Sequence, residues 1–466
     1  MRLMPVIAIA AALAGNGCAV EGAKPAPPAV PAAFEQPSTQ GPWPDADWYR
    51  GFASGELDSL ITLAEHNSLD IAAAVARVKR ADARARQAGA ALLPQVDLNG
   101  NVTQIGGGSN GATAHETDWG ALLSASYEID FWGKNRAAAN SSQALAGASR
   151  ADLAAVRITI SNSVAASYFQ VLSLRQRIAL ARVNLEAAEG ILRFTEARYQ
   201  AGSIGPAELA AQRAAVANAE LTVPQLQQQE AEARGALALL VGREPEGFTV
   251  TGESLDALAE PLVAAGLPSD LLQRRPDLIT AEGNLQAANA DLTAARAAMF
   301  PSLTLTANGG VQNPAVQAAV ITLAGTGWSL SAGASLVQTI FDSGRRRAAV
   351  DEAAAKQEEL IAQYHGSILA ALVDVENALT GLHYLELQKQ AQQRNADQSE
   401  RAFQGAELRY REGVGEYLLV LEAQRTLDAA RDQLSQYKLE RLKALLGLCR
   451  ALGGGWQYPT SSQKSS

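Results

Sequence analysis

The chain has 466 residues, of which 19% are charged and 5% aromatic, and its formal net charge is −9. This acidic balance excludes the broad basic surface that binding to nucleic-acid phosphates requires, so we expect no nucleic-acid partner. The four histidines share no metal-ligand spacing, and neither a HExxH nor a CxxC motif occurs. We therefore expect that the protein is not an enzyme and holds neither a metal nor a cofactor.

The first 17 residues are typical of an export signal. Arg2 supplies a positive end, and residues 6–14 form an apolar run that is too short to span a bilayer. Cys18 follows, and its position predicts cleavage before this residue and its acylation as a lipoprotein anchor. The three preceding residues depart from the usual pattern, and the alternative is earlier cleavage that leaves Cys18 as a free thiol. Residues 18–64 are then a lipidated, proline-rich, extended segment that leads into an equatorial region.

Two copies of one unit make up most of the chain. Four residue pairs share a single offset of 211: Tyr199 and Tyr410, Gly202 and Gly413, Gly133 and Gly344, and Gly242 and Gly453. Self-similarity at a fixed offset is the signature of a repeated structural unit. We place the units at 65–245 and 270–455, joined by a linker and equatorial segment at 246–269, and we expect a disordered tail at 456–466.

Each unit is expected to contain a helix, two strands, a very long helix, a tip and a return helix. Apolar and polar residues alternate in four segments, which predicts strands at about 94–105, 119–131, 301–312 and 328–340. The alternation fits a small antiparallel sheet packed on helices, and it also fits a membrane barrel with lipid outside and water inside. The strand length of roughly 10–13 residues and the aromatic residues near the strand ends favour the barrel. These aromatic residues are Trp119, Phe131, Trp132, Phe300, Trp328 and Phe341.

Four strands cannot close a barrel by themselves, because the smallest outer-membrane barrels have about eight. Open strand edges are not tolerated in lipid, so a barrel requires several chains. Two chains would supply eight strands and three chains twelve, and the alternation does not choose between them. Gly106–Ser109 has no following Lys-Ser/Thr pair and is expected to be a surface hairpin loop between the first two strands.

The segments 134–200 and 345–411 are predicted to be helices on the order of 100 Å long. Apolar residues recur in the first at seven-residue steps: Val164, Val171, Ile178, Leu185, Leu192 and Tyr199. In the second they are Ile361, Ile368, Val375 and Leu382, and Phe403 and Tyr410 resume the register after Lys389 and Ala396. Such heptads require a partner helix, which we place in the antiparallel return helices at about 206–241 and 416–449.

The helices at about 65–92 and 270–299 would continue this returning path toward the strands. A solid coiled coil and a hollow helical cylinder both satisfy the pattern. We favour the cylinder, because both long helices follow directly on the predicted membrane strands. Cys449 is expected to be a small buried apolar side chain.

Three stretches carry a resemblance to a known family. They are Leu267–Asp277 with the sequence LPSDLLQRRPD, Ala297–Leu303 with AAMFPSL, and Arg409–Arg425 with RYREGVGEYLLVLEAQR. The chain resembles the TolC-like outer-membrane efflux proteins, in their NodT-type lipoprotein branch. The resemblance implies an α+β membrane protein, a homotrimer with a twelve-stranded transmembrane β-barrel that is continued by a long periplasmic α-helical barrel. It also implies a location in the bacterial outer membrane, and it favours three chains over two.

The function that this resemblance implies is the exit duct of a tripartite efflux pump. The duct would conduct drugs or other toxic small molecules passively from the periplasm to the exterior. Its partners would be outer-membrane lipid, a periplasmic adaptor protein and an inner-membrane transporter of the resistance-nodulation-division (RND) type. The alternatives are a duct for type I protein secretion and a periplasmic coiled-coil scaffold without a pore.

The resemblance also assigns candidate site residues. Glu422 would line a gate at the periplasmic aperture, where many family members have Asp; the alternative is a solvated carboxylate on a helix face. The two tips, at 201–206 and 412–416, would contact the adaptor. The tip residues concerned are Gly202, Ser203, Ile204, Gly205, Gly413, Val414 and Gly415.

Arg274, Arg275 and Asp277 form a charged cluster around Pro276. Such a cluster is a conceivable catalytic site. Because proline favours the first turn of a helix, we expect these residues instead to cap and brace the start of the second unit.

Overall fold

The computed structural model describes residues 31–35, 42–109, 112–312 and 327–457. Cys18, the predicted signal at 1–17 and most of the predicted tail at 456–466 lie outside the described residues. The chain divides into two compact units. We call them the strand unit (Arg77–Arg150 and Thr280–His365) and the helical unit (Pro28–Ala76, Ala151–Ile279 and Gly366–Ser466), and describe each by itself.

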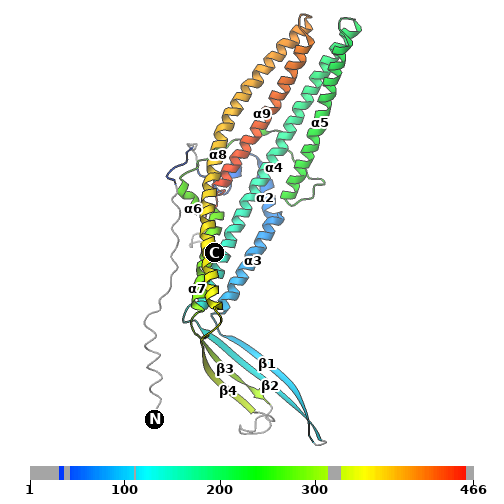
Figure 1. The fold of residues 1–466 in the computed structure, drawn as a ribbon. Helices are drawn as coiled ribbons and strands as arrows, with labels where there is room; N and C mark the ends of the chain where they lie inside the picture. The colour runs from blue at the N-terminus through cyan, green and yellow to red at the C-terminus, as the bar shows by residue number, and fades with distance from the viewer. Residues whose placement is uncertain (1–30, 36–41, 110–111, 313–326, 458–466) are drawn as a thin grey trace. The chain divides into compact units, whose positions relative to one another are not determined.

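The strand unit contains a four-stranded antiparallel sheet with the order β1-β2-β3-β4 (Figure 1). The strands are β1 (Gln95–Ser109), β2 (Ala112–Ile129), β3 (Ser302–Gln312) and β4 (Gly327–Val337). The pairing of β2 with β3 joins the first repeat to the second. In the part of the chain that the structure describes, β1 pairs only with β2 and β4 only with β3, so the sheet has two open edges.

The expectation of a hairpin loop at Gly106–Ser109 is wrong. This segment continues β1, and its backbone pairs with β2 from Gly106 opposite His115 to Ser109 opposite Ala112. The ladder is built from main-chain donors and acceptors, so it continues through glycines that show no apolar–polar alternation. The first two strands are therefore longer than predicted, with 15 and 18 residues.

The strand register gathers the apolar residues on one face of the sheet. One row across the four strands consists of Leu98, Leu123, Gly309 and Leu330, and the next row, on the opposite face, consists of Asp97, Ser124, Asn308 and Ser331. Leu98 and Leu330 are each 76% exposed in the single chain. The predicted alternation is thus confirmed, and the apolar face is open to the surroundings.

Both long helices begin with the same arrangement just after a strand pair. They are α4 (Lys134–Gln200) and α8 (Arg345–Arg411), with 67 residues each. Gly133 and Gly344, one residue before each start, have φ of +77° and +83°, a region that favours glycine. The carboxylate of Asp130 accepts from the backbone N–H groups of Asn135 and Arg136 at 3.1 and 2.8 Å, and Asp342 accepts from those of Gly344 and Arg346 at 3.2 and 3.3 Å. These contacts satisfy N-terminal donors that lack a partner inside the helix.

The helices before the strands are broken where the sequence predicted continuous ones. The first consists of α2 (Gly55–Asn67) and α3 (Leu69–Ala90), and the second of α6 (Leu271–Arg274) and α7 (Pro276–Ala297). Ser68 and Arg275 adopt extended backbone at the breaks, and at Arg275 the following proline disfavours helical geometry.

The two repeated units also resemble each other at these helix breaks. Gly242 lies against the carbonyl of Asn67 and Gly453 against that of Arg274, so closely that neither site has room for a Cβ atom. Both glycines have positive φ. Glycine at the end of each return helix therefore permits the approach of the broken helix that precedes the strands.

The helical unit pairs each long helix with an antiparallel return helix, α4 with α5 (Pro206–Leu240) and α8 with α9 (Tyr417–Ala451) (Figure 1). The Gln212 side chain of α5 donates to the carbonyl of Ala188 in α4, and that of Gln392 in α8 donates to the carbonyl of Ala430 in α9, each at 2.8 Å. Short 3-10 helices η1 (Trp48–Phe52), η2 (Leu255–Ala257) and η3 (Pro268–Asp270) complete the unit.

The main core of the helical unit draws on both repeats and on the N-terminal segment. Phe52 packs on Phe169 with ring centroids 5.0 Å apart, and Val164, Val375 and Cys449 are fully buried in the same cluster. The burial predicted for Cys449 is thus confirmed. Among the described residues, no helix combines the length and the hydropathy needed to cross a membrane.

Candidate functional site

The two long helices end in the same backbone motif at the predicted tips. Gly202 and Gly413 have φ of +72° and +77°, and both follow the last helical turn. The N–H of Ser203 donates to the carbonyl of Arg198, and that of Val414 to the carbonyl of Arg409, each at 3.0 Å. This is the Schellman arrangement, in which a left-handed residue lets the chain reverse while terminal carbonyls keep a donor.

The second tip is the tighter of the two. The N–H of Gly415 also donates to the carbonyl of Arg409 at 3.0 Å. A Cβ atom at Gly415 would lie 2.9 Å from the backbone carbon of Arg409 and 2.9 Å from the nitrogen of Tyr410. Gly205 in the first tip has open space at the corresponding atom. Only the second tip therefore requires glycine for a close backbone approach.

A buried hydrogen-bond chain joins helices next to the tips. Tyr417, at the start of α9, donates from its hydroxyl to Oε1 of Gln212 at 2.6 Å, and Nε2 of Gln212 donates to the carbonyl of Ala188 at 2.8 Å. Burial, with a smaller contribution from Tyr410, raises the pKa of Tyr417 to about 12. The phenol therefore stays protonated and keeps donating across the physiological pH range.

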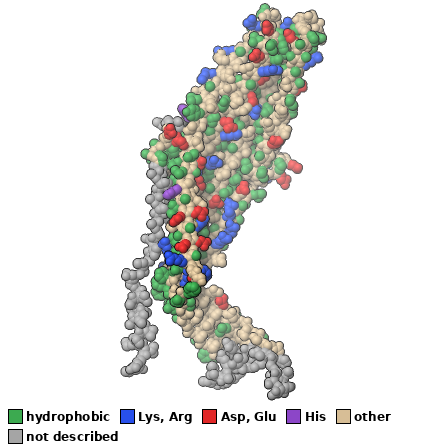
Figure 2. Space-filling model, viewed as in Figure 1, with side chains coloured by type: hydrophobic (Ala, Val, Ile, Leu, Met, Phe, Trp, Pro, Cys, Tyr) green, Lys and Arg blue, Asp and Glu red, His purple; other side chains and the backbone are tan. Residues whose placement is uncertain are grey.

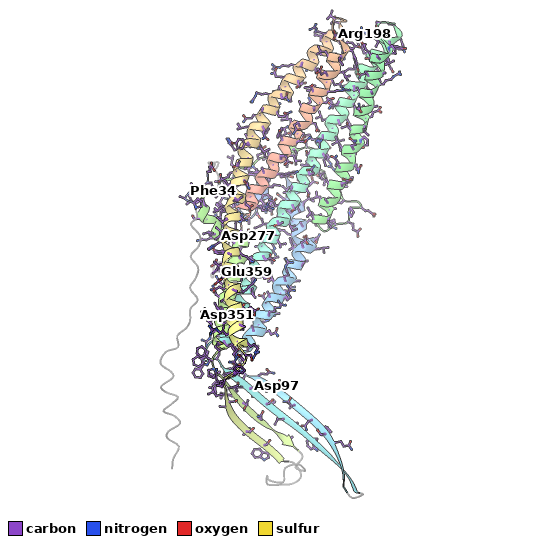
Figure 3. The ribbon with its side chains drawn as sticks, in the orientation of Figure 1. Phe34, Asp97, Arg198, Asp277, Asp351 and Glu359 are labelled. Atoms are coloured by element: carbon purple, nitrogen blue, oxygen red, sulfur yellow. The ribbon has the colours of Figure 1, made fainter. Side chains whose placement is uncertain are left out.

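A cation–aromatic contact joins the first tip to the second repeat. Arg198 lies next to the first tip, near the end of α4 (Figure 3). Its guanidinium lies 4.9 Å from the ring centroid of Tyr410, and Phe194 packs edge-on against the same ring at 5.6 Å. The sequence had paired Tyr410 with Tyr199 as repeat equivalents, but Tyr410 is 2% exposed and Tyr199 is 42% exposed. Neither this contact nor the Gln212–Tyr417 bond can be predicted from the sequence, because periodicity does not indicate which of two equivalent side chains becomes buried.

A groove of about 510 Å³ lies between the tips. Ser203 and Ile204 of the first tip and Gly415 of the second line it, together with Arg198, Glu208, Tyr410, Glu416, Tyr417, Leu418 and Leu421. The structure thus brings three of the seven predicted tip residues into one concave surface. Gly202, Gly205, Gly413 and the exposed Val414 do not line it.

Glu422 lies on the exposed side of α9, just beyond the second tip. Leu418 and Arg425 are exposed at helical spacings of four and three residues from it, so the three side chains share one face. Leu421 and Gln424 are buried on the other side. In the single chain, Glu422 is therefore available to a neighbouring molecule or to solvent.

Arg275 is a buried brace, as the sequence analysis expected. Its guanidinium donates to Asp277 at 2.6 Å, to Asp374 of α8 at 3.1 Å, and to the carbonyls of Ala371 and Ala451 at 3.4 and 3.1 Å. Burial lowers the pKa of Arg275, and the two carboxylates outweigh this effect and raise it. The charged group thus ties the start of α7, where Asp277 lies (Figure 3), to α8 and α9.

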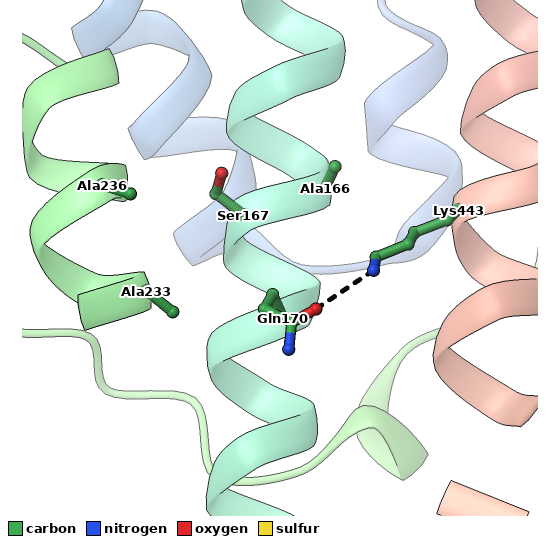
Figure 4. Close-up of a pocket in the computed structure, with 6 residues that line it drawn as sticks. All are labelled: Ala166, Ser167, Gln170, Ala233, Ala236 and Lys443. Carbon is green, nitrogen blue, oxygen red and sulfur yellow. Dashed lines mark hydrogen bonds between the residues drawn. The ribbon is translucent and has the colours of Figure 1, made fainter. Parts of the chain in front are cut away.

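A second, smaller pocket of about 260 Å³ lies between α4, α5 and α9 (Figure 4). Three alanines and Ser167 line it, and Nζ of Lys443 donates to Oε1 of Gln170 at 3.1 Å. The same Nζ also donates to Oε1 of Glu440 at 3.1 Å. Within the described ranges, no group of three or more His, Cys, Asp and Glu side chains could hold a metal ion.

One carboxyl on α9 has a strongly shifted pKa. Burial raises the pKa of Asp428 to about 6, an effect that the nearby Arg431 opposes. Arg431 itself pairs with Glu400 of α8 at 2.9 Å. A raised pKa means that Asp428 contributes most to stability when it is protonated, and that this contribution is lost as the pH rises through 6.

Asp428→Asn should therefore raise the stability of the folded protein by roughly 1–2 kcal/mol at pH 8 and leave it unchanged at pH 4. The measurement is the midpoint of thermal unfolding in detergent at both pH values. Asp397→Asn, which removes an exposed carboxylate from α8, is the control and should leave the midpoint unchanged at both. An equal effect of Asp428→Asn at pH 4 and pH 8 would contradict the assignment.

Comparison with known proteins places this geometry in a family. The sequence matches the family described as "Outer membrane efflux protein" at residues 60–243 and again at 267–454. The two matched segments correspond to the two repeats.

Individual relatives agree. The chain is 43% identical over 419 residues to the pyoverdine export outer membrane protein OpmQ of Pseudomonas aeruginosa, a match that covers 88% of this chain and 87% of that protein. It is 31% identical over 465 residues to the cation efflux system protein CusC of Escherichia coli, covering 98% of this chain and 99% of that protein. The solved structure of the outer-membrane channel OprN superposes with a TM-score of 0.86 at 28% identity, covering 95% of this chain and all of that one. The chain therefore belongs to the outer membrane efflux protein family.

Proposed function

We propose that this protein is the exit duct of a tripartite efflux pump and conducts small molecules passively from the periplasm to the exterior. The observation that carries the proposal is the four-stranded sheet, whose exposed apolar face spans all four strands between two open edges. An apolar face of this extent suits hydrocarbon, and the polar face suits a water-filled lumen. The chain belongs to a family of outer-membrane proteins, which supports an apolar face turned toward lipid and a polar face turned toward the lumen.

Closure of the sheet requires other copies of the chain. The unpaired donors and acceptors of the β1 and β4 edges cannot remain open in lipid. Three chains joined edge to edge would supply a twelve-stranded barrel, and their helices would continue it as a periplasmic helical barrel. Large apolar side chains on the exposed faces of the helices support such association; they include Leu221, Leu239, Leu369, Val373 and Leu387.

The periplasmic end would meet the adaptor protein, and through it the RND transporter of the inner membrane. The groove between the tips supports this assignment, because it joins Ser203, Ile204 and Gly415 from both repeats in one concave surface. We extend the contact to Gly202, Gly205, Gly413 and Val414, which flank it.

The N-terminal end would be anchored by acylation of Cys18. The position of this cysteine directly after an export signal supports the proposal. A lipid anchor would hold the N-terminal segment at the same membrane as the sheet.

The cargo would be small molecules. The relatives support this class by their names, which specify pyoverdine export and cation efflux. A passive conduit takes its selectivity from the pump that loads it, so we assign no single compound.

The test of the proposed function combines mass and conductance. The detergent-extracted complex should have the protein mass of three chains, and it should form channels in a planar bilayer. A monomer that carbonate washes from the membrane would overturn the proposal in favour of a peripheral coiled-coil scaffold.

Within this proposal, Glu422 forms part of the periplasmic gate. Glu422→Gln should raise the open-channel population by roughly tenfold, since three exposed ion pairs of about 0.5 kcal/mol each would be lost per trimer. The partner in the closed trimer would be Arg425 of a neighbouring chain, because this arginine shares the exposed face of α9 with Glu422. Single-channel recording measures the effect. Glu412→Gln, which removes an exposed carboxylate from the second tip, should leave the channel closed; equal conductance of both variants would remove Glu422 from the gate.

A further inference from the structure

Two exposed charged stripes of opposite sign lie on the helices at the two edges of the sheet. On α3, which leads into β1, the exposed basic side chains Arg77, Arg80 and Arg84 share one helical face. On α8, which follows β4, exposed Asp351 and Glu358 lie seven residues apart on one face, with Glu352 and Glu359 beside them. Figure 2 shows basic side chains along α3 and acidic ones along α8, and Figure 3 labels Asp351 and Glu359.

The two stripes lie at matching distances from the sheet. Arg84 is six residues from the strand-proximal end of α3 at Ala90, and Asp351 is six residues from that of α8 at Arg345. Arg77 and Glu358 are each thirteen residues from the same ends. At 1.5 Å per residue, the two pairs lie about 9 Å and about 20 Å along their helices.

The seam between the two repeats shows how such helices meet. There β2 pairs with β3, so α4, which follows β2, lies next to α7, which precedes β3. Gly283 of α7 packs against Ala148 of α4, and the Thr280 hydroxyl donates to the carbonyl of Ala148 at 3.3 Å. Gly283 and Ala148 are each fourteen residues from the strand-proximal ends of their helices. Residues at equal distances from the sheet thus meet across the β2–β3 seam, the seam in which a helix that follows a strand pair meets a helix that precedes the next pair.

The same relation across the open edges would bring α8 of one chain next to α3 of another. At the internal seam, the residues that correspond to Asp351 and Glu358 by the 211 offset are Asn140 and Gly147, which are uncharged. The acidic pair of α8 therefore has no counterpart on α4, its equivalent at the internal seam. Within the described residues, neither Arg84 nor Asp351 has an ion-pair partner in its own chain.

We infer that the basic stripe of α3 binds the acidic stripe of α8 in a second copy of this chain, with Arg84 opposite Asp351 and Arg77 opposite Glu358. The inference rests on the proposed closure of the barrel through the β4 and β1 edges. The interface is head-to-tail, because two different surfaces meet, and such an interface gives a ring when the rotation between copies closes, as barrel closure requires. Opposite charges at equal distances from the sheet also favour one register between β4 and β1 of the two chains, and they make a shifted register less stable.

Disulfide trapping tests the geometry in the intact protein. A variant with both Arg84→Cys and Asp351→Cys should give covalently linked dimers and trimers on oxidation, seen by denaturing electrophoresis without reductant. The control variant carries Arg84→Cys and Glu359→Cys. The distances of these two sites from the strand-proximal ends of their helices differ by eight residues, so this variant should give little product. Equal yields from the two variants, or product from the control alone, would overturn the inference.

Charge reversal tests the interaction. Arg84→Glu and Asp351→Arg should each lower the temperature at which the trimer dissociates in detergent by several degrees, and the double variant should recover most of the loss. Arg86→Glu, on another face of α3, should have little effect. If the wild-type protein is a trimer and the double variant recovers nothing, the inference fails while the proposed function stands. If the wild-type protein is monomeric, the proposed function fails first.

Discussion

Replacing Arg275 with methionine should lower the free energy of unfolding by about 2 kcal/mol, because two half-exposed carboxylates and two main-chain carbonyls lose a buried charged donor. The guanidinium is buried, and it is the donor to two carboxylates and two carbonyl groups. Methionine fills much of the same volume, so the loss reports the polar contacts and not a cavity. The measurement is the midpoint of thermal unfolding in detergent, which should fall by several degrees.

Arg274→Met is the matched control for this prediction. Arg274 is the adjacent arginine, and its guanidinium lies 4.5 Å from the ring centroid of Trp43, an interaction worth about 0.5–1 kcal/mol. Arg275→Met should therefore destabilise the protein several times more than Arg274→Met. Equal effects of the two substitutions would show that the network contributes no more than a single surface contact.

Gly415→Ala should open the periplasmic end of the channel and destabilise the protein by about 1–3 kcal/mol, the usual cost of overpacking. The added Cβ would lie 2.9 Å from backbone atoms of Arg409 and Tyr410, and backbone cannot give way as a flexible side chain can. The start of α9 must then shift, which strains the bond from Tyr417 to Gln212. The expected results are a higher single-channel conductance and a lower midpoint of thermal unfolding.

Gly205→Ala provides the control, because a Cβ at Gly205 meets open space and its φ of −84° suits alanine. This variant should match the wild-type protein in both measurements. If Gly415→Ala also matches it, the close approach in the second tip has no influence on the proposed gate.

The local patterns of the sequence predicted the elements well. Alternation with a period of two marked the four strands, and heptads marked the two long helices, which the structure has at Lys134–Gln200 and Arg345–Arg411. The offset of 211 predicted the repeat, and each of its glycine pairs has positive φ in the structure. Such signals are readable because each depends on residues close together in the chain or on a copied local motif.

The sequence predicts an element wrongly where its local signal is absent or ambiguous. The glycine-rich end of β1 carries no side-chain pattern, so the sequence predicts a loop there. The break at Ser68 has no proline to mark it. The helix predicted at about 270–299 runs through the break at Arg275, but the start expected near Pro276 is where α7 begins.

The sequence by itself thus determined the repeat, the element types, the apolar face of each strand and the family resemblance. Only the tertiary structure decided the strand order β1-β2-β3-β4, the register that aligns four apolar faces, and the groove that joins the two tips. It also decided that Tyr410 is buried while its equivalent Tyr199 is exposed. The physical reason is that these features depend on contacts between residues far apart in the chain, and neither periodicity nor motif spacing records which distant surfaces meet.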